Sequence, residues 1–400
     1  MKTKTLHFCK ALFYVFSINS PYFLLSIFTV FIIGIISDNS SSISTAFVMT
    51  LPAILQIFFS LIGGVLFDKI KSFQKKMAHI FFRTLSFISI YLIFKVDGES
   101  DFFVFCLYIF SCVLICLDMA LLSTSALIVK EKFGFSFSKF SSFSSILARG
   151  SLAIAPFTTM FFLNESLVYK MTSTIIITFL LIVSLAYPLF LLKDQDQDQD
   201  QDQDQDQDQD QDYKKDTINI FAFSFISNIS TGSIYYLLIT NGNWYASSSI
   251  YIALVVVQFI SIIFPGKFLI FLNLLNFKIT IISYLFLSVF VFMLSGSNFN
   301  ENGVIYSILI GGMYGITLIL FSEYLYGKIK KKSAYKVLGI NKAITKSSSM
   351  LSIYISSSLI VFGVSHETVI MLCGILGVVF SFFLLFFNEI YFSKQKLLFK

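Results

Sequence analysis

The feature that most constrains this chain is its series of long apolar segments. The hydrocarbon core of a lipid bilayer is about 30 Å thick, so a helix needs about 20 residues to cross it. Only structures that satisfy their own backbone hydrogen bonds are stable there. Twelve segments of the sequence are long and apolar enough to be such helices, and they span residues 13–36, 44–67, 78–94, 102–129, 143–163, 168–192, 218–239, 247–264, 279–294, 304–325, 340–362 and 368–387.

The composition supports membrane helices and excludes several other classes of protein. Hydrophobic residues make up 56% of the 400 residues and charged residues 13%, far from the balance of a soluble domain. The five cysteines and three histidines have no metal-binding spacing. The sequence also contains no phosphate-binding loop, nucleophile elbow or HExxH motif. We therefore expect no enzyme, no nucleic-acid-binding protein, and no metal or cofactor.

The lysine and arginine residues indicate how these helices are oriented. Basic residues are retained on the cytoplasmic side of membrane proteins. If the N-terminus is cytoplasmic, 23 of the 29 basic residues lie in cytoplasmic segments and two, Lys95 and Lys170, lie on the opposite side. One missed or additional helix would destroy this asymmetry. We therefore expect a multi-pass protein of the plasma membrane with both termini in the cytoplasm.

A tract of alternating Asp and Gln residues divides the helices into two groups of six. Residues 194–212 contain ten Asp. Such a tract buries no apolar surface and its charges repel one another, so we expect a disordered cytoplasmic linker over residues 193–216. A cation site or a partner site is the alternative function for this tract. The expected domains are a six-helix bundle over residues 1–192 and another over residues 217–400.

A short internal similarity links the two halves. The sequence FSINS at residues 16–20 is similar to FISNIS at residues 225–230. The similarity places Asn19 and Asn228 at comparable depth in the first and seventh segments. These side chains either line a cavity or form hydrogen bonds between helices.

The end of the second apolar segment and the loop after it contain a recognisable motif formed by Gly64, Asp68 and Lys69. Gly64 permits close approach of helices, and Asp68 can cap a neighbouring helix or bind a cation at the membrane surface. The pattern resembles the G-x-x-x-D-[RK]-x-G-[RK]-[RK] motif of the major facilitator superfamily, with the second Gly absent. The wider stretch LPAILQIFFSLIGGVLFDK resembles the macrolide-efflux-type branch of that family. This resemblance implies that the three residues form a cytoplasmic gate.

The resemblance also implies a fold and a direction of transport. Members of this family have two six-helix bundles around a central cavity and work by alternating access. Gly150, Ser151, Ala155 and Pro156 partly match the antiporter signature of the family, which favours export. The alternative function for Pro156 is a kink in its helix.

Charged residues inside the apolar segments are the best functional candidates, because a charge at mid-bilayer costs several kcal/mol. Asp118 precedes Lys130 by 12 residues and Arg149 follows Lys139 by 10. At about 1.5 Å per residue they lie about 18 and 15 Å from the cytoplasmic edge, at matching depth on a helical hairpin. They form a permanent ion pair, or one of them binds a proton or the substrate, or they make no contact.

Other ionisable residues lie closer to the ends of the segments. Glu323 either carries a proton in a water-filled cavity or pairs with the lysines at 328–332. Arg83 lies within two turns of the cytoplasmic end of its helix, so we expect it to extend to the lipid phosphates. We expect His79 to be peripheral.

These features and the resemblance together predict a secondary active transporter that exports small amphipathic compounds in exchange for protons. Asp118 and Glu323 would carry the proton, Arg149 would be a counter-ion, and Asn19 and Asn228 would contact the substrate. The expected partners are a small-molecule substrate, the proton and the lipid bilayer, and the protein is taken to be a monomer. An uptake permease of the same fold and a transport-inactive sensor or immunity protein are the alternatives.

Overall fold

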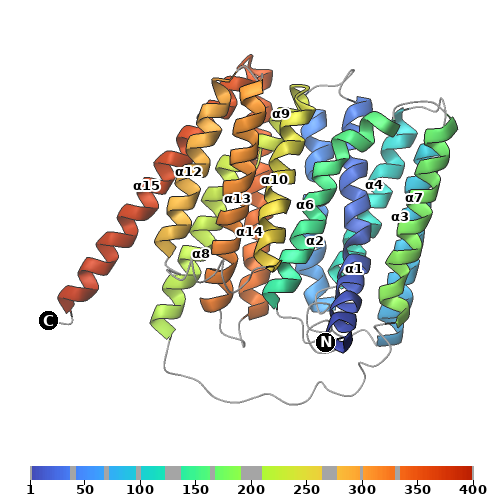
Figure 1. Cartoon of the computed structure of the whole chain (residues 1–400), viewed down its shortest axis with the longest axis horizontal. Coiled ribbons are helices and arrows are strands. Elements are labelled where there is room, and N and C mark those ends of the chain that lie inside the picture. The colour runs from blue at the N-terminus through green and yellow to red at the C-terminus, as the bar shows by residue number, and fades with distance from the viewer. Residues whose placement is uncertain are drawn as a thin grey trace. The chain divides into compact units, whose positions relative to one another are not determined.

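A computed structural model of the chain describes residues 2–36, 42–66, 72–95, 101–121, 137–162, 167–190, 210–263, 277–297, 301–328 and 334–398. These residues are helical apart from short turns, and none of them lies in a strand, which confirms the expected all-α fold (Figure 1). The helices are α1 (Lys2–Ile36), α2 (Ser42–Leu66), α3 (Ser72–Lys95), α4 (Asp101–Leu121), α6 (Phe137–Phe162), α7 (Leu167–Phe190), α8 (Asp210–Thr231), α9 (Ile234–Thr240), α10 (Trp244–Ile263), α12 (Phe277–Ser295), α13 (Glu301–Lys328), α14 (Ala334–Val361) and α15 (His366–Leu398).

Each of the twelve apolar segments corresponds to a helix, and the seventh corresponds to two. Helices α8 and α9 are separated by a turn at Gly232 and Ser233. The turn lies against α14, where a Cβ atom on Gly232 would be 2.9 Å from the Cα atom of Ser349. Among the described residues, eight stretches are long and apolar enough to cross a membrane, and one of them runs through this turn over Asp216–Thr240. The seventh crossing is therefore a broken helix at a point of close helix contact.

The helices form two compact units, and the boundary lies in the Asp-Gln tract. Unit 1 contains Met1–Ser40 and Phe47–Asp208, and unit 2 contains Ser41–Ala46 and Gln209–Lys400. The expected disordered linker extended to residue 216, whereas α8 begins at Asp210. Acidic residues stabilise the N-terminus of a helix through its dipole, so the end of the tract can form helix. Residues 193–209 lie outside the described residues.

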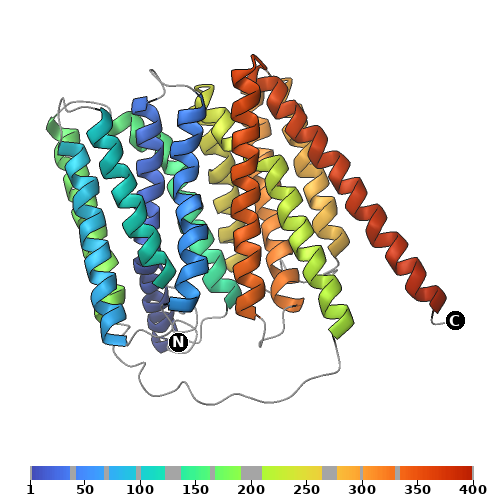
Figure 2. The same ribbon diagram turned by 180° about the vertical axis from the view of Figure 1, so that it is seen from behind.

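Unit 1 is a bundle in which the helices run side by side (Figures 1 and 2). Helix α1 packs along α6 and α7, and α3 packs against α4 and α7. Ala11, Val15 and Ile18 of α1 form a buried apolar cluster with Tyr187 of α7. Four of these helices, α1, α3, α4 and α7, surround the polar residues described below.

Unit 2 is held by close helix packing and by hydrogen bonds between neutral side chains. Helix α12 packs against α13 and α15, and α10 packs against α13. The contact between α10 and α13 is close because a Cβ atom on Gly311 would lie 2.9 Å from the Cα atom of Ile250. The hydroxyls of Ser283 and Thr317 join α12 to α13 at 2.9 Å. The last turns of α15 project away from the rest of unit 2 (Figure 2).

Candidate functional site

A charged cluster of His79, Arg83 and Asp118 lies inside unit 1. His79 and Arg83 are four residues apart on α3 and so share one face of that helix, and Asp118 lies in the last turn of α4. Their side chains are 1%, 0% and 0% exposed. Nδ1 of His79 donates to Oδ1 of Asp118 at 2.6 Å, and Nε of Arg83 donates to Oδ1 at 3.1 Å and Oδ2 at 3.0 Å. The cluster therefore has one carboxylate shared between a guanidinium and an imidazole.

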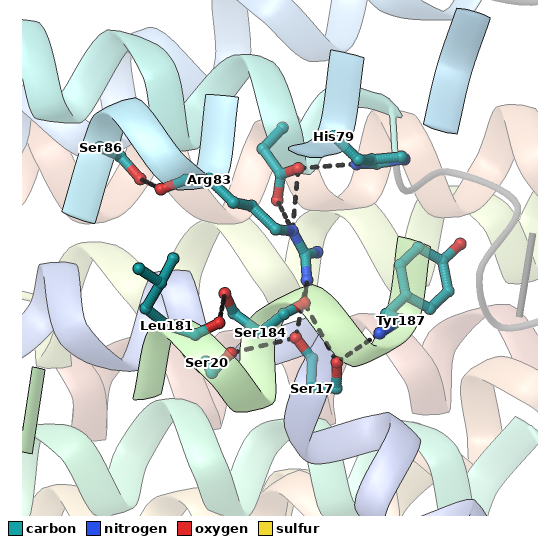
Figure 3. A network of polar contacts seen from close by, with 9 residues as sticks. Ser17, Ser20, His79, Arg83, Ser86, Leu181, Ser184 and Tyr187 are labelled. Carbon is teal, nitrogen blue, oxygen red and sulfur yellow. Dashed lines mark hydrogen bonds and ion pairs between the residues drawn. The ribbon is translucent and has the colours of Figure 1, made fainter. Parts of the chain in front are cut away.

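The guanidinium of Arg83 also binds two main-chain carbonyls, one from α1 and one from α7 (Figure 3). Its Nη1 donates to the carbonyl oxygen of Ser17 at 2.9 Å and to that of Ser184. Each carbonyl lies four residues before a proline, Pro21 in α1 and Pro188 in α7. Proline has no N–H, so the usual helical hydrogen bond to that carbonyl cannot form. Arg83 supplies a charged donor to both carbonyls, beside the hydroxyls of Ser20 and Ser17, which donate to the carbonyls of Ser17 at 3.0 Å and Ser184 at 3.2 Å.

The ring of Tyr187 completes the surroundings of the guanidinium. The Cζ atom of Arg83 lies 5.5 Å from the centre of this ring, within the range of a cation–π interaction. Nη2 of Arg83 is buried and has no hydrogen-bond partner among the described residues. His79 meets the same ring edge-on at 5.6 Å. The backbone N–H of Tyr187 donates to Oγ of Ser17 at 2.8 Å, which ties α7 to α1 beside the cluster.

A third proline is compensated in the same way elsewhere in unit 1. Pro52 leaves the carbonyl of Val48 in α2 without its helical donor. The hydroxyl of Tyr108 in α4 donates to that carbonyl at 2.8 Å, and it is 3.1 Å from the hydroxyl of Thr29 in α1. Buried polar side chains of α3 and α4 therefore satisfy the carbonyls that prolines free in α1, α2 and α7.

Of the three alternatives for Asp118 and Arg149, the permanent ion pair between them is wrong. Asp118 pairs with Arg83 and His79 of α3, and Nε of Arg149 donates to Oγ of Ser145 within its own helix at 3.4 Å. The physical reason is packing. Helix α4 packs against α3 and α1, whereas α6 packs against α1 and α7. Equal depth on consecutive helices therefore did not make Asp118 and Arg149 neighbours.

The expected positions of Arg83 and His79 are also wrong. Arg83 was expected to extend to lipid phosphates and His79 to be peripheral, but both are fully buried. Inside the bundle, the carboxylate of Asp118 and the two freed carbonyls are acceptors for Arg83. Its side chain therefore points inward and not toward the lipid phosphates. The signal available in the sequence was the pair of basic residues at i and i+4, together with prolines four residues after Ser17 and Ser184.

The two asparagines of the internal similarity have one bond in common and otherwise differ. Nδ2 of Asn19 donates to the carbonyl of Val15 at 2.8 Å, and Nδ2 of Asn228 donates to that of Ser224 at 2.7 Å, each four residues back. Asn19 is buried, and its Oδ1 accepts a hydrogen bond from Ser144 of α6 at 2.7 Å. Asn19 thus joins two helices, whereas Asn228 is half-buried and bonds within its own helix.

Several of the remaining candidate residues lie outside the described residues. Gly64 lies in α2, and Asp68 and Lys69 lie outside the described residues, as does the side chain of Glu323 in α13. Among the residues that can be searched, no group of three His, Cys, Asp or Glu side chains could hold a metal ion.

Comparisons with known proteins relate the fold of this chain to membrane transporters. No protein-family model and no curated protein sequence matches it. The crystal structure of the nucleoside transporter NupG matches with a TM-score of 0.62 at 14% identity, covering 96% of this chain and 98% of that one. The crystal structure of a D-xylose-proton symporter matches with a TM-score of 0.65 at 11% identity, covering 94% and 97%.

At these identities the likeness concerns the fold. The chain has the fold of these transporters, which is the major facilitator fold that the motif after α2 implied. The match runs over nearly the whole length of both chains, so it includes both units.

Proposed function

We propose that the chain is a secondary active transporter of the plasma membrane that exports small amphipathic compounds in exchange for protons. The observation that carries this proposal is the charged cluster, which is fully buried in a bundle with the fold of known transporters. Ionisable residues inside a membrane are rare because they are costly, and those present usually belong to ion or substrate pathways. The macrolide-efflux resemblance of the stretch around Pro52 and Gly64 supports the direction of transport.

Coupling requires a group that interacts differently with its surroundings in the two conformations of the cycle. The charged cluster fits this requirement because α1, α4 and α7 are all bonded to α3 through Arg83. A change in the charge of the cluster would alter bonds to three helices at once. We therefore assign coupling to the cluster that contains Asp118, with Glu323 of α13 as a second candidate.

Other residues of the predicted site keep proposed roles that fit their positions. Arg149 and Asn228 are half-buried, and we propose them as contacts for the substrate. Asn19 is engaged with Ser144, so it is a helix contact that sets the position of α6 on α1. The loop over 64–69 is proposed as the cytoplasmic gate on the strength of its motif.

Uptake by a protein of the same fold is the second candidate function. One matched structure is a proton symporter for D-xylose and the other is a nucleoside transporter. Both export and uptake use the same fold and a coupled proton, so the buried cluster does not separate them. The direction of proton movement does.

Everted membrane vesicles acidified by respiration would test both candidates, with a quenched fluorescent amine as the reporter of the pH gradient. If a macrolide added outside is exchanged for luminal protons, the fluorescence should recover. Asp118→Asn should abolish the recovery. Asp216→Asn, which changes a half-buried carboxylate at the start of α8 outside the cluster, should leave it intact.

The other outcomes are equally informative. A nucleoside or D-xylose that deepens the quench enters together with protons, which would establish an uptake permease instead. A panel of amphipathic compounds, nucleosides and sugars that all leave the gradient unchanged would refute transport. If none of these compounds changes the gradient but one of them binds the purified protein, the protein would be a sensor.

A further inference from the structure

His79 is not needed to satisfy the other groups of the charged cluster. Nε of Arg83 already contacts both oxygens of Asp118, and Nη1 of Arg83 already serves the carbonyls of Ser17 and Ser184. A purely structural clamp would be complete with Arg83 and Asp118 alone. His79 adds the one side chain type that ordinarily changes its charge between pH 5 and 8.

The geometry fixes where a second proton on His79 would go. A carboxylate only accepts hydrogen bonds, so Nδ1 carries the proton that it donates to Oδ1 of Asp118. A second proton can therefore bind only at Nε2. Its arrival changes the formal charge of the cluster from zero, with Arg83 positive and Asp118 negative, to plus one.

The added charge changes the competition for Asp118. Nδ1 of His79 and Nε of Arg83 both bind Oδ1, and a charged imidazolium is the stronger donor of the two forms of histidine. Asp118 would then be shared between two cations instead of one. An uncompensated charge in a buried site is costly, so the charged form is stabilised by any conformation that lets water reach it.

We propose that His79 is the residue that accepts the coupled proton, while Asp118 stays ionised between Arg83 and the imidazole. The proton on Nε2 weakens the hold of Asp118 on Arg83 and favours a conformation in which the cluster is hydrated. Asp118 is then a positioning residue that orients His79 and compensates Arg83. The inference rests on the proposed function only in treating this proton as the coupled one. The protonation of His79 and the hydration of the cluster can both be measured without a substrate.

The groups that face His79 from the neighbouring helices are few. Helix α4 contributes Asp118, α7 contributes the ring of Tyr187, and α3 itself contributes Arg83 one turn after His79 and the half-buried Lys75 one turn before it. From α1, the described residue beside the cluster is Ser17, which is neutral. The pH dependence of the site is therefore governed by His79 between Asp118 and Arg83.

The test is hydrogen–deuterium exchange of the full chain in lipid nanodiscs at pH 8 and pH 5.5, corrected for intrinsic exchange with an unstructured reference peptide. Peptides that contain Ser17, Asp118 and Ser184 should exchange faster at the lower pH. The increase should be about tenfold if the closed form binds the second proton ten times more weakly than the hydrated form. His79→Gln, which retains a donor but does not titrate in this range, should lose the increase.

His366→Gln is the matched control. His366 is half-buried at the start of α15 in unit 2, whereas the cluster belongs to unit 1, so this variant should retain the full pH response. Imidazole ¹⁵N spectra of the wild-type protein keep the test decisive if His79→Gln does not fold. They should show His79 gaining a proton over the pH range in which exchange rises.

Two results would overturn the inference. One is a pH response in His79→Gln equal to that of the wild type, and the other is a His79 that remains neutral at pH 5.5 in the wild-type spectra. Neither result bears on whether the protein moves substrates, which the vesicle assay decides. Conversely, a wild-type protein that shows both His79 signatures but moves no compound would retain this inference and lose the proposed function.

Discussion

The assignment of Arg83 as the donor for carbonyls freed by proline can be tested by replacing both members of its ion pair. In the double variant Arg83→Leu/Asp118→Leu, no isolated charge is left in the bundle. The carbonyls of Ser17 and Ser184 nevertheless lose their donor at Nη1. Each carbonyl still accepts from a serine hydroxyl, Ser17 from Ser20 and Ser184 from Ser17, so what is lost is one of two hydrogen bonds at each. At about 0.5–1.5 kcal/mol per hydrogen bond, the two losses together should lower the free energy of unfolding by about 1–3 kcal/mol.

Removing the prolines should then rescue this double variant. Pro21→Ala and Pro188→Ala restore the N–H groups that reach Ser17 and Ser184, so each should recover about 0.5–1.5 kcal/mol in that background. Pro52→Ala is the internal control. Its carbonyl partner is already served by Tyr108, so this substitution gains only the general helix preference of alanine over proline, which all three share.

Equilibrium unfolding in mixed micelles, monitored by circular dichroism, would supply the free energies for a double-mutant cycle. The coupling between Pro21 and Arg83 is the difference between the effect of Pro21→Ala with and without Arg83. We expect a coupling of about 0.5–1.5 kcal/mol for Pro21 and none for Pro52. Equal effects of Pro21→Ala and Pro52→Ala in the double variant would refute the reasoning, as would a double variant as stable as the wild type.

Two further predictions concern helix contacts. Gly311→Ala should destabilise unit 2 by about 1–3 kcal/mol in the same equilibrium unfolding assay, because the new Cβ atom would overlap with Ile250. Gly312→Ala, whose Cβ would have nothing within 4 Å, should be neutral or stabilising. Asn19→Ala should cost about 1–2 kcal/mol, because it removes the bond from Ser144 that joins α1 to α6. Retention of full stability by Asn19→Ala would show that this bond does not hold the two helices together.

The helices were predictable from the sequence because the bilayer imposes a minimum length on each apolar segment. The ninth segment, predicted over residues 279–294, is α12 over Phe277–Ser295, so its ends were placed within two residues. The break at Gly232 was not predicted. It depends on the close approach of α14, and no local pattern reports a neighbour that is more than 100 residues away.

The charged cluster was only half predictable. The cost of burying a charge singled out Asp118 correctly as an unusual residue, but it did not identify the partner. Helix order in space, not depth in the membrane, decides which side chains meet, and α3 rather than α6 lies against α4. His79 lies near the start of its predicted segment, over residues 78–94, and that position likewise does not tell which face of α3 it occupies.

The carbonyls that Arg83 binds have a consequence for how these positions can vary in evolution. One guanidinium donates to two carbonyls that prolines on different helices leave free, so losing the arginine removes a charged donor from both carbonyls at once and leaves each with a serine hydroxyl. Losing either proline gives its carbonyl a main-chain donor in addition to the arginine. Substitutions at positions 21, 83 and 188 should therefore be correlated among descendants of a common ancestor. Homologues without the arginine should have regained ordinary residues at both proline positions.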